Sequence, residues 1–513
     1  MTLVKTYGCA VQGIQANTVT VEVNIDTGIN FFIVGLPDSA VKESQQRIDA
    51  ALRNNGFRIP GKKITVNMAP ADVRKEGSAY DLTIAAGILA ASEQMPAHEV
   101  ERFVLMGELA LDGELRPIRG VLPIAMQAQA AGFEGMIVPY DNAREAAVVE
   151  GLPVYAMKHL KEVISFFCGQ RPEPVKLDLA AEFATEPLLT DADLAEVKGQ
   201  SIVRHALEIA AGGGHNILMI GPPGAGKTML AKRLPGILPP MSLREALETT
   251  KIHSVAGRSS KGAGLITRRP FRSPHHTISD VALVGGGGFP QPGEISLAHN
   301  GVLFLDELPE YKRTVLEVMR QPLEDRVVTI SRARFSVDFP AGFMLVASMN
   351  PCPCGFFSHP EKKCVCPPGA VQNYMNRISG PLLDRIDMHV EVSPLGFNEL
   401  SSNNPGETSA TVRERVMRVR EVQLKRFANT PGVYCNAQMT ASMVREYCVL
   451  DDAGKEVLKL AMNKLGFSAR GFDRMLKVAR TIADMQGNEQ ITRQNIQSAV
   501  FFRNLDRKNY YSN

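Results

Sequence analysis

The 513-residue sequence has little of what marks an exported, membrane-bound or strongly charged protein. Its opening, MTLVKTYGCAVQGIQANTV, lacks the apolar core of a secretory signal, and no later stretch gives about eighteen consecutive apolar residues. The net charge is only +3, from 57 basic and 54 acidic residues, so charge alone indicates neither a nucleic-acid nor a membrane partner. We therefore expect a cytoplasmic protein without membrane association, whose basic surface is local.

Cysteine is also scarce, with eight in the chain, and in a cytoplasmic protein we expect thiols or metal ligands rather than disulfides. Four of the eight nevertheless lie within MNPCPCGFFSHPEKKCVCPPG, as two C-x-C pairs among turn-forming prolines and glycines. Structural zinc is the favoured interpretation, with His359 able to replace one thiolate, and reduced thiols packing a loop or a redox switch are the alternatives. The predicted ligands are Cys352, Cys354, Cys364 and Cys366.

Hydrophobic periodicity divides the chain into four parts. Residues 1–172 alternate β-rich runs such as NTVTVEVNID and KITVNM with a helical run, SAVKESQQRIDAALRNNG, and predict an α+β domain. Residues 173–190 are rich in proline and acidic residues and indicate a linker. Residues 191–395 alternate apolar strands (HNILMI, GVLFLDE, GFMLVASMN) with helices, which is typical of a parallel sheet, and 396–513 have mainly helical periodicity.

The strongest chemical signal is HNILMIGPPGAGKTMLAKRL, in which an apolar strand runs into the full GxxxxGK[ST] phosphate loop. Glycine allows backbone N–H groups to curl around a phosphate, and the following helix N-terminus adds its partial positive charge. We expect Lys227 to reach the terminal phosphates and Thr228 to ligate Mg²⁺. The predicted ATP-binding residues are Gly221, Pro222, Pro223, Gly224, Ala225, Gly226, Lys227 and Thr228.

An acidic motif, GVLFLDELPE, follows the phosphate loop along the chain. A buried strand ending in two acids is expected to place Asp306 at the Mg²⁺ water shell and Glu307 where it polarises the attacking water. Any strand leaving a core can end in such a pair, so the motif is weak alone. Together with the phosphate loop it predicts an ATPase that uses Mg²⁺.

The motifs that follow the acidic pair along the chain resemble those of the AAA+ ATPases, in the same order. LVASMNP ends a third strand with Asn350, which matches their polar sensor, and ISGPLLDRIDMHVEV resembles the segment that carries the arginine finger, placed at Arg385. In GFSARGFDRMLKVARTIADM, Arg470 matches the second sensor of the helical lid, with Arg474 one turn later as its rival. An arginine finger acts on the ATP of a neighbouring subunit, so the resemblance implies a ring.

Two further segments are similar to the magnesium-chelatase branch of AAA+ proteins, which insert extra hairpins. One insert contains His275 and His276, and adjacent histidines favour capping or packing over a metal or catalytic role. The other, RVVTISRARFSVDF, predicts a hairpin whose tip carries Arg332 and Arg334. In a ring such tips face the pore, where these arginines are expected to meet a DNA backbone; the alternative is a solvated hairpin end.

The N-terminal domain has a separate resemblance, in VLMGELALDGELRPIRGVLPIAMQAQAAGF, to the Lon protease fold. RKEGSAYDL places Ser78 where that family has its nucleophile. The position of the lysine base falls at about Ala128, and residues 76–157 contain no lysine. A serine without its base is a weak nucleophile, so we expect a protease fold without proteolysis, as in the recombination ATPase RadA.

A Lon-like domain, a chelatase-type AAA+ core and a helical lid, in that order, resemble the YifB/ComM family over essentially the whole chain. The resemblance implies a hexameric motor and helicase that drives branch migration in homologous recombination during natural transformation. Its implied partners are single-stranded and branched DNA and a recombinase or other recombination proteins. A chelatase-type ATPase that remodels a protein partner is the alternative function, and an ATP-dependent protease is disfavoured by the missing lysine.

Overall fold

The chain forms two compact units in the computed structural model. Unit 1 contains Met1–Glu186 and Leu243–Thr267, and unit 2 contains Pro187–Ser242 and Arg268–Asn513. Among the residues described, no helix combines the length and the apolar character needed to cross a membrane. The structure describes residues 2–185, 192–259, 262, 264–288, 290–332, 335–357, 359–396, 406–465 and 468–503.

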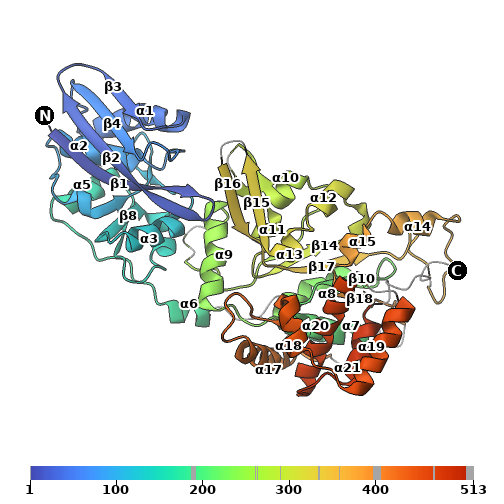
Figure 1. Ribbon diagram of the computed structural model, residues 1–513. Coiled ribbons are helices and arrows are strands. Elements are labelled where there is room, and N and C mark those ends of the chain that lie inside the picture. The colour runs from blue at the N-terminus through green and yellow to red at the C-terminus, as the bar shows by residue number, and fades with distance from the viewer. Residues whose placement is uncertain are drawn as a thin grey trace. The chain divides into compact units, whose positions relative to one another are not determined.

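Unit 1 is built on a mixed seven-stranded sheet with the order β3-β4-β2-β1-β5-β8-β9 (Figure 1). Along β2 the inward residues Val19, Val21 and Val23 are fully buried, as expected when alternate side chains face the core. Helix α1 (Ser39–Asn54) begins where the Asp38 side chain accepts a hydrogen bond from the Val41 amide. The strands are β1 (Thr2–Gln12), β2 (Gln15–Asp26), β3 (Phe31–Val34), β4 (Lys63–Ala69), β5 (Phe103–Leu105), β8 (Gly135–Pro139) and β9 (Val154–Met157).

Helix α9 (Leu243–Val255) belongs to unit 1, although its sequence lies between the phosphate loop and the acidic motif. The helix packs against α3 (Val121–Ala130), and the Gly120 amide at the start of α3 donates to the Ser254 carbonyl over 3.1 Å. The boundaries predicted at 172, 190 and 395 stay predictions. The structure adds an excursion of the chain into unit 1 that periodicity did not indicate.

Unit 2 contains a five-stranded parallel sheet with the order β11-β14-β17-β10-β18. The three apolar strands predicted from HNILMI, GVLFLDE and GFMLVASMN are confirmed as β10, β14 and β17, and all their residues are buried. Since the strands are parallel, the residues that follow them share one edge, called here the carboxyl edge, and those that precede them share the amino edge. The strands are β10 (Ile217–Ile220), β11 (Phe271–Arg272), β14 (Val302–Leu305), β17 (Met344–Met349) and β18 (Met388–Glu391).

Two hairpins interrupt this parallel pattern. One is short and joins β12 (Gly285–Gly286) to β13 (Gln291–Pro292), between helices α10 (Asp280–Val284) and α11 (Glu294–Leu297). The other pairs β15 (Val327–Arg332) with β16 (Phe335–Pro340) in antiparallel register and confirms the hairpin predicted from RVVTISRARFSVDF. Arg332 is the last residue of β15, whereas Arg334 lies outside the described residues.

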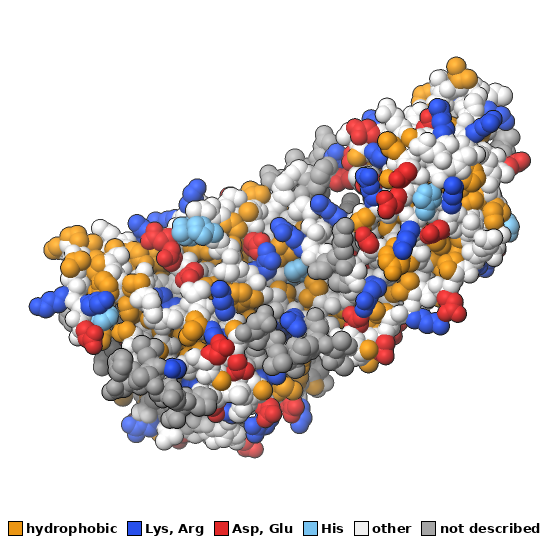
Figure 2. Space-filling model, turned by 180° about the vertical axis from the view of Figure 1, so that it is seen from behind, with side chains coloured by type: hydrophobic (Ala, Val, Ile, Leu, Met, Phe, Trp, Pro, Cys, Tyr) orange, Lys and Arg blue, Asp and Glu red, His pale blue; other side chains and the backbone are white. Residues whose placement is uncertain are grey.

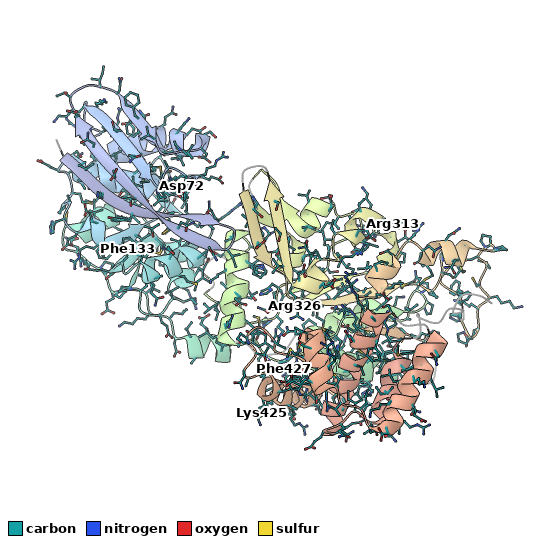
Figure 3. All side chains as sticks on the ribbon, in the orientation of Figure 1. Asp72, Phe133, Arg313, Arg326, Lys425 and Phe427 are labelled. Atoms are coloured by element: carbon teal, nitrogen blue, oxygen red, sulfur yellow. The ribbon has the colours of Figure 1, made fainter. Side chains whose placement is uncertain are left out.

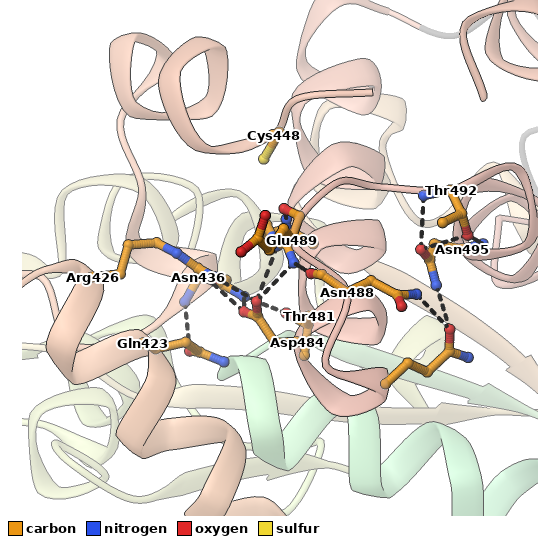
Figure 4. A network of polar contacts seen from close by, with 12 residues as sticks. Gln423, Arg426, Asn436, Cys448, Thr481, Asp484, Asn488, Glu489, Thr492 and Asn495 are labelled. Atoms are coloured by element: carbon orange, nitrogen blue, oxygen red, sulfur yellow. Dashed lines mark hydrogen bonds and ion pairs between the residues drawn. The ribbon is translucent and has the colours of Figure 1, made fainter. Parts of the chain in front are cut away.

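The C-terminal part of unit 2 is helical, as its periodicity predicted. Helix α17 ends with Lys425 exposed and the following Phe427 buried in the core (Figure 3). A polar network joins these helices: Asp484 accepts hydrogen bonds from Arg426, from Asn436 over 2.8 Å and from Arg480 over 3.0 Å (Figure 4). The helices are α17 (Ser409–Arg426), α18 (Ala441–Tyr447), α19 (Asp452–Leu465), α20 (Ala469–Gln486) and α21 (Arg493–Phe501).

Charge is mixed on the face drawn in Figure 2, where basic and acidic side chains lie among one another without one large field of a single sign. This agrees with the near balance of 57 basic and 54 acidic residues.

Candidate active site

The phosphate loop follows β10 at the carboxyl edge and turns into helix α8 (Lys227–Arg233). Gly224 and Gly226 have φ of +79° and +86°, in the left-handed region where glycine is favoured. At Gly221 an added Cβ would come within 2.2 Å of the Val392 carbonyl oxygen, so the backbone of the next strand leaves no room for a side chain. Glycine is therefore required at Gly224 and Gly226 by the backbone conformation and at Gly221 by the lack of space for a side chain.

Lys227 folds back over this loop. Its Nζ donates to the carbonyls of Gly221 and Pro222 over 2.7 and 2.9 Å and to Asn350 Oδ1 over 3.2 Å. Burial lowers the pKa of Lys227, whereas the carboxylates of Asp306 and Glu307 raise it. A phosphate bound to the loop would therefore compete with these three neutral oxygens for the hydrogen bonds of the Lys227 ammonium group.

Asp306 follows β14 at the same edge and lies against the start of α8. Thr228 Oγ1 donates to Asp306 Oδ2 over 2.7 Å, and Ser348 in β17 donates to the other carboxylate oxygen. A hydroxyl and a carboxylate in contact are the hard oxygen donors that Mg²⁺ prefers beside a phosphate. The residues fit the predicted Mg²⁺ site, and Ser348 is a partner of Asp306 that the motifs did not indicate.

Glu307 has a side chain that is 56% exposed and a backbone in the left-handed region, with φ of +53°. Its Oε2 lies 3.6 Å from Nδ1 of His276. Sequence reasoning favoured capping or packing for His275 and His276; the structure places His276 against the predicted catalytic glutamate. No spacing in the sequence links residues 276 and 307, because the contact joins two different loops.

The four clustered cysteines lie directly after Asn350 and their sulfurs converge. The Sγ–Sγ distances are 3.3 Å for Cys352 and Cys354, 3.7 Å for Cys352 and Cys364, and 3.5 Å for Cys354 and Cys364. All four ligand atoms, Cys366 included, lie within 4.8 Å of one another. Tetrahedral zinc with bonds of about 2.3 Å separates its sulfurs by about 3.8 Å, so the set fits zinc.

His359 does not join this group. Its Nδ1 accepts hydrogen bonds from the amides of Glu361 and Lys362, over 3.1 and 3.0 Å, and so closes a turn. Burial alone would raise the pKa of Cys354, but the amides of Phe356 and Val365 lower it to about 6. Amide hydrogen bonds to sulfur are the support that a metal thiolate needs.

The cysteine loop also touches the nucleotide loop. At Gly355, whose φ is +82°, an added Cβ would lie 2.5 Å from Cδ of Pro223. The two loops therefore pack without a side chain between them. A change in the shape of the cysteine loop would be transmitted directly to Pro223.

Arg385 and Arg470 lie together at the amino edge of the sheet, away from the phosphate loop. Asn216, directly before β10, donates to the Arg385 carbonyl over 3.3 Å, which places Arg385 at the opposite end of a strand about 13 Å long. Both guanidinium groups contact Glu324 in α13 (Pro322–Asp325), that of Arg470 over 3.3 Å. The predicted arginine finger, Arg385, and the predicted second sensor, Arg470, thus contact the same carboxylate, that of Glu324.

Arg474, the rival second sensor, is used differently. Its Nη1 lies 2.6 Å from Oδ1 of Asp387, whose Oδ2 accepts a hydrogen bond from the Asn216 backbone amide over 2.8 Å. Burial alone would raise the pKa of Asp387, but Arg474 and His215 hold it far below its ordinary value. Burial lowers the pKa of Arg326, and the charges of Cys435 and Asp387 oppose this effect only in part. Arg474 is therefore committed to a buried ion pair.

In unit 1, Ser78 donates a hydrogen bond to the carboxylate of Glu108. Ala128, the position expected for the protease base, is fully buried in α3. The nearby Lys75 is also buried, and its Nζ donates to the Pro70 carbonyl. The described contacts of Ser78 are thus with an acid rather than with a lysine.

Comparison with known proteins gives consistent matches along the chain. The family model for magnesium chelatase, subunit ChlI, matches residues 193–400, a second model for subunit ChlI of Mg-chelatase matches 21–142, and the ChlI C-terminal model matches 406–503. Over 128 residues, 25% of this chain and 22% of the relative, the chain is 30% identical to Lon protease 2 of Bacillus subtilis.

Two relatives match from end to end. The chain is 45% identical over 514 residues to the competence protein ComM of Haemophilus influenzae, covering 99% of this chain and 98% of ComM. It is 44% identical over 505 residues to the YifB protein of Escherichia coli, covering 97% and 96%.

Proposed function

The chain belongs to the YifB/ComM family of magnesium-chelatase-like AAA+ proteins, and from this premise we propose that it is an ATP-driven DNA motor acting in homologous recombination during natural transformation. The family is consistent with ATPase activity, and a full-length relative is named as a competence protein. The observation that carries the proposal is the convergence of Lys227, Thr228, Asp306 and Asn350 at one edge of the sheet.

Each residue at this edge has a part in hydrolysis. Bound Mg²⁺ would be held by Thr228 and Asp306 and would neutralise charge on the phosphates. Lys227 exchanges its carbonyl partners for phosphate oxygens, and Asn350, which already contacts Lys227, orients the terminal phosphate. Glu307 polarises the attacking water. The exposed position of Glu307 leaves room for that water on its carboxylate.

A ring with shared sites is part of the proposal. Arg385 and Arg470 lie at the edge of the sheet opposite their own phosphate loop, so in this conformation they are directed away from their own nucleotide. To act on the ATP of a neighbouring copy, the two arginines exchange Glu324 for phosphate oxygens. We assign the helices of residues 396–513 as the lid that carries Arg470, and a homo-hexamer as the assembly.

DNA contact is assigned to the β15–β16 hairpin, at Arg332 and Arg334. Helix α17 is a second basic element, in which Arg415 pairs with Glu208 over 2.6 Å and Arg426 pairs with Asp484, while Arg418 and Lys425 are exposed. Arg415 and Arg426 would have to give up these partners before they could neutralise phosphates. Replacing Arg332 and Arg334 with Ala is expected to flatten the salt dependence of DNA binding and abolish DNA-stimulated hydrolysis, with basal hydrolysis within a few-fold of wild type.

Zinc is assigned to Cys352, Cys354, Cys364 and Cys366. The four sulfurs have the separations that a tetrahedral ion requires, and the loop they form packs on Pro223. When bound, the ion would supply rigidity rather than chemistry, because four thiolates leave no open position. Its effect on catalysis is therefore through the shape of the phosphate loop.

The decisive experiment is steady-state ATP hydrolysis by purified protein with no DNA and with single-stranded, duplex and forked DNA, followed by a branch-migration assay on a synthetic three-strand junction. A DNA motor shows stimulation by single-stranded or branched DNA and ATP-dependent strand exchange. Hydrolysis that is indifferent to all three DNAs, at salt concentrations low enough for binding, contradicts the proposal. Such a result would favour a chelatase-type ATPase that remodels a protein partner.

A further inference from the structure

His276 makes a contact that the motifs of the nucleotide site do not account for. Its Nδ1 lies 3.6 Å from Oε2 of Glu307, and its side chain is 32% exposed. The residue comes from the loop that joins β11 to α10, whereas Glu307 follows β14. Two loops that are separate in sequence thus bring an imidazole to the carboxylate expected to polarise water.

The imidazole is held in place from two sides. The ring centroids of His275 and His276 are 4.0 Å apart, and the edge of Tyr311 faces His276 at 6.4 Å. Tyr311 is buried, and its hydroxyl donates to the Pro274 carbonyl over 2.6 Å. This bond fastens the His276 loop to the segment directly after Glu307, so the two loops have a fixed spacing.

Glu307 itself lacks such constraints at its side chain, which is 56% exposed. An exposed glutamate samples several rotamers, and only some of them aim its carboxylate at a water in line with a phosphate. Proton abstraction needs that geometry before any adjustment of basicity matters. A neighbouring group that selects one rotamer therefore raises the turnover rate without touching the nucleotide.

We propose that His276 is the positioning residue that orients the Glu307 carboxylate for hydrolysis. The inference rests on the proposed function in taking Glu307 as the group that polarises water. His276 attracts the carboxylate through Nδ1 and moves no proton in the reaction.

Three variants test the assignment. His276→Ala removes the contact, and His276→Asn restores a nitrogen near the position of Nδ1. His98→Ala is the matched control, since it also removes an imidazole beside a glutamate: Nε2 of His98 lies 3.9 Å from Oε1 of Glu99 in unit 1, and its side chain is exposed. For each variant kcat and KM are measured from hydrolysis without DNA, and nucleotide affinity is measured from the fluorescence of a labelled ATP analogue.

His276→Ala is expected to lower kcat by about 10- to 100-fold with KM and nucleotide affinity unchanged. His276→Asn should recover most of that loss, and His98→Ala should stay within about two-fold of wild type. Equal effects of the two alanine variants, or a loss of nucleotide affinity in His276→Ala, would overturn the inference. Absence of hydrolysis in the wild type would instead contradict the proposed function.

Discussion

The two edges of the parallel sheet in unit 2 are built on different principles. At the carboxyl edge, Thr228 at the start of α8 and Glu307 on a loop are exposed, and their partners are few. At the amino edge, Arg385 and Asp387 are buried, with Arg385 paired to Glu324 and Asp387 to Arg474. The carboxyl edge keeps these polar groups available for a ligand, whereas at the amino edge they are engaged in ion pairs within the protein.

This difference suggests that the carboxyl edge serves ligand binding and the amino edge serves the stability of the fold. Groups that must bind Mg²⁺ or a phosphate gain nothing from strong partners inside the chain. Asp387 has such partners: Arg474 at 2.6 Å and the Asn216 amide at 2.8 Å hold it at the base of β10, the strand that carries the phosphate loop. We therefore expect substitutions at the carboxyl edge to change rates and substitutions at the amino edge to change stability, with Arg385 as the exception.

The largest effect is expected at Glu307. Glu307→Gln should bind ATP normally and hydrolyse it at least about 100-fold more slowly, since an amide cannot polarise the attacking water as a carboxylate does. Glu310→Gln makes the same chemical change three residues away, where the side chain pairs with Arg377 over 2.9 Å, and is the control. Hydrolysis rates and labelled-nucleotide binding measure both; equal losses in the two variants would contradict the assignment.

Arg385 tests whether the amino edge acts on a neighbouring copy. Arg385→Ala alone should hydrolyse ATP about 100-fold more slowly while still binding it. Mixed with Glu307→Gln subunits, it should regain activity, because a site between unlike subunits can combine an intact Glu307 with an intact Arg385. A mixture no more active than its components contradicts the shared site.

Arg377→Ala is the control for this experiment, since the Arg377 side chain is 53% exposed. Thermal unfolding of Arg385→Ala, which loses a buried ion pair, shows whether the variant is folded. Loss of hydrolysis in Arg377→Ala with normal hydrolysis in Arg385→Ala would move the predicted finger to Arg377.

Asp387 tests the supporting role of the amino edge. Asp387→Asn is expected to lower the free energy of unfolding at pH 7 by about 3 kcal/mol, because it leaves the partly buried Arg474 without its counter-ion. The folded-state pKa of Asp387 is depressed, so its contribution is complete above the unfolded pKa of about 4 and is lost as the pH falls through the folded value.

The difference between wild type and Asp387→Asn should therefore shrink below about pH 4, as followed by urea unfolding from pH 7 to pH 3. Asp384→Asn is the control, as Asp384 accepts an exposed hydrogen bond from Ser468 over 3.0 Å. A constant difference across this range would show that the carboxylate charge is not what stabilises the edge.

The smallest effect is expected at the cysteine loop, which supports the carboxyl edge from outside. Purified protein should contain about one zinc per subunit, with Zn–S distances near 2.3 Å by X-ray absorption. Cys354→Ser should lose the metal and bind ATP roughly tenfold more weakly, because the loop that packs on Pro223 is loosened. Cys168→Ser, an exposed cysteine outside the group, is the control. Protein isolated without zinc would contradict the assignment.

The sequence predicted the carboxyl edge well for a local reason. The phosphate loop and the acidic pair each occupy a few consecutive residues after an apolar strand, and parallel strands bring such loops to one edge. The Arg385–Glu324–Arg470 contact was beyond that reasoning, because its members lie on α13, before β18 and at the start of α20. Helical periodicity indicates which face is buried, not which charge lies opposite.

The sequence by itself determined three of the five strands of the sheet, the phosphate loop with its acidic partners, and the clustering of four cysteines within fifteen residues. These follow from chain connectivity, which fixes neighbours before any folding occurs. Only the tertiary structure decided that His276 faces Glu307, that α9 packs in unit 1, and that the four sulfurs converge on one point. Such contacts depend on how separate segments pack, and packing is set by the whole core at once.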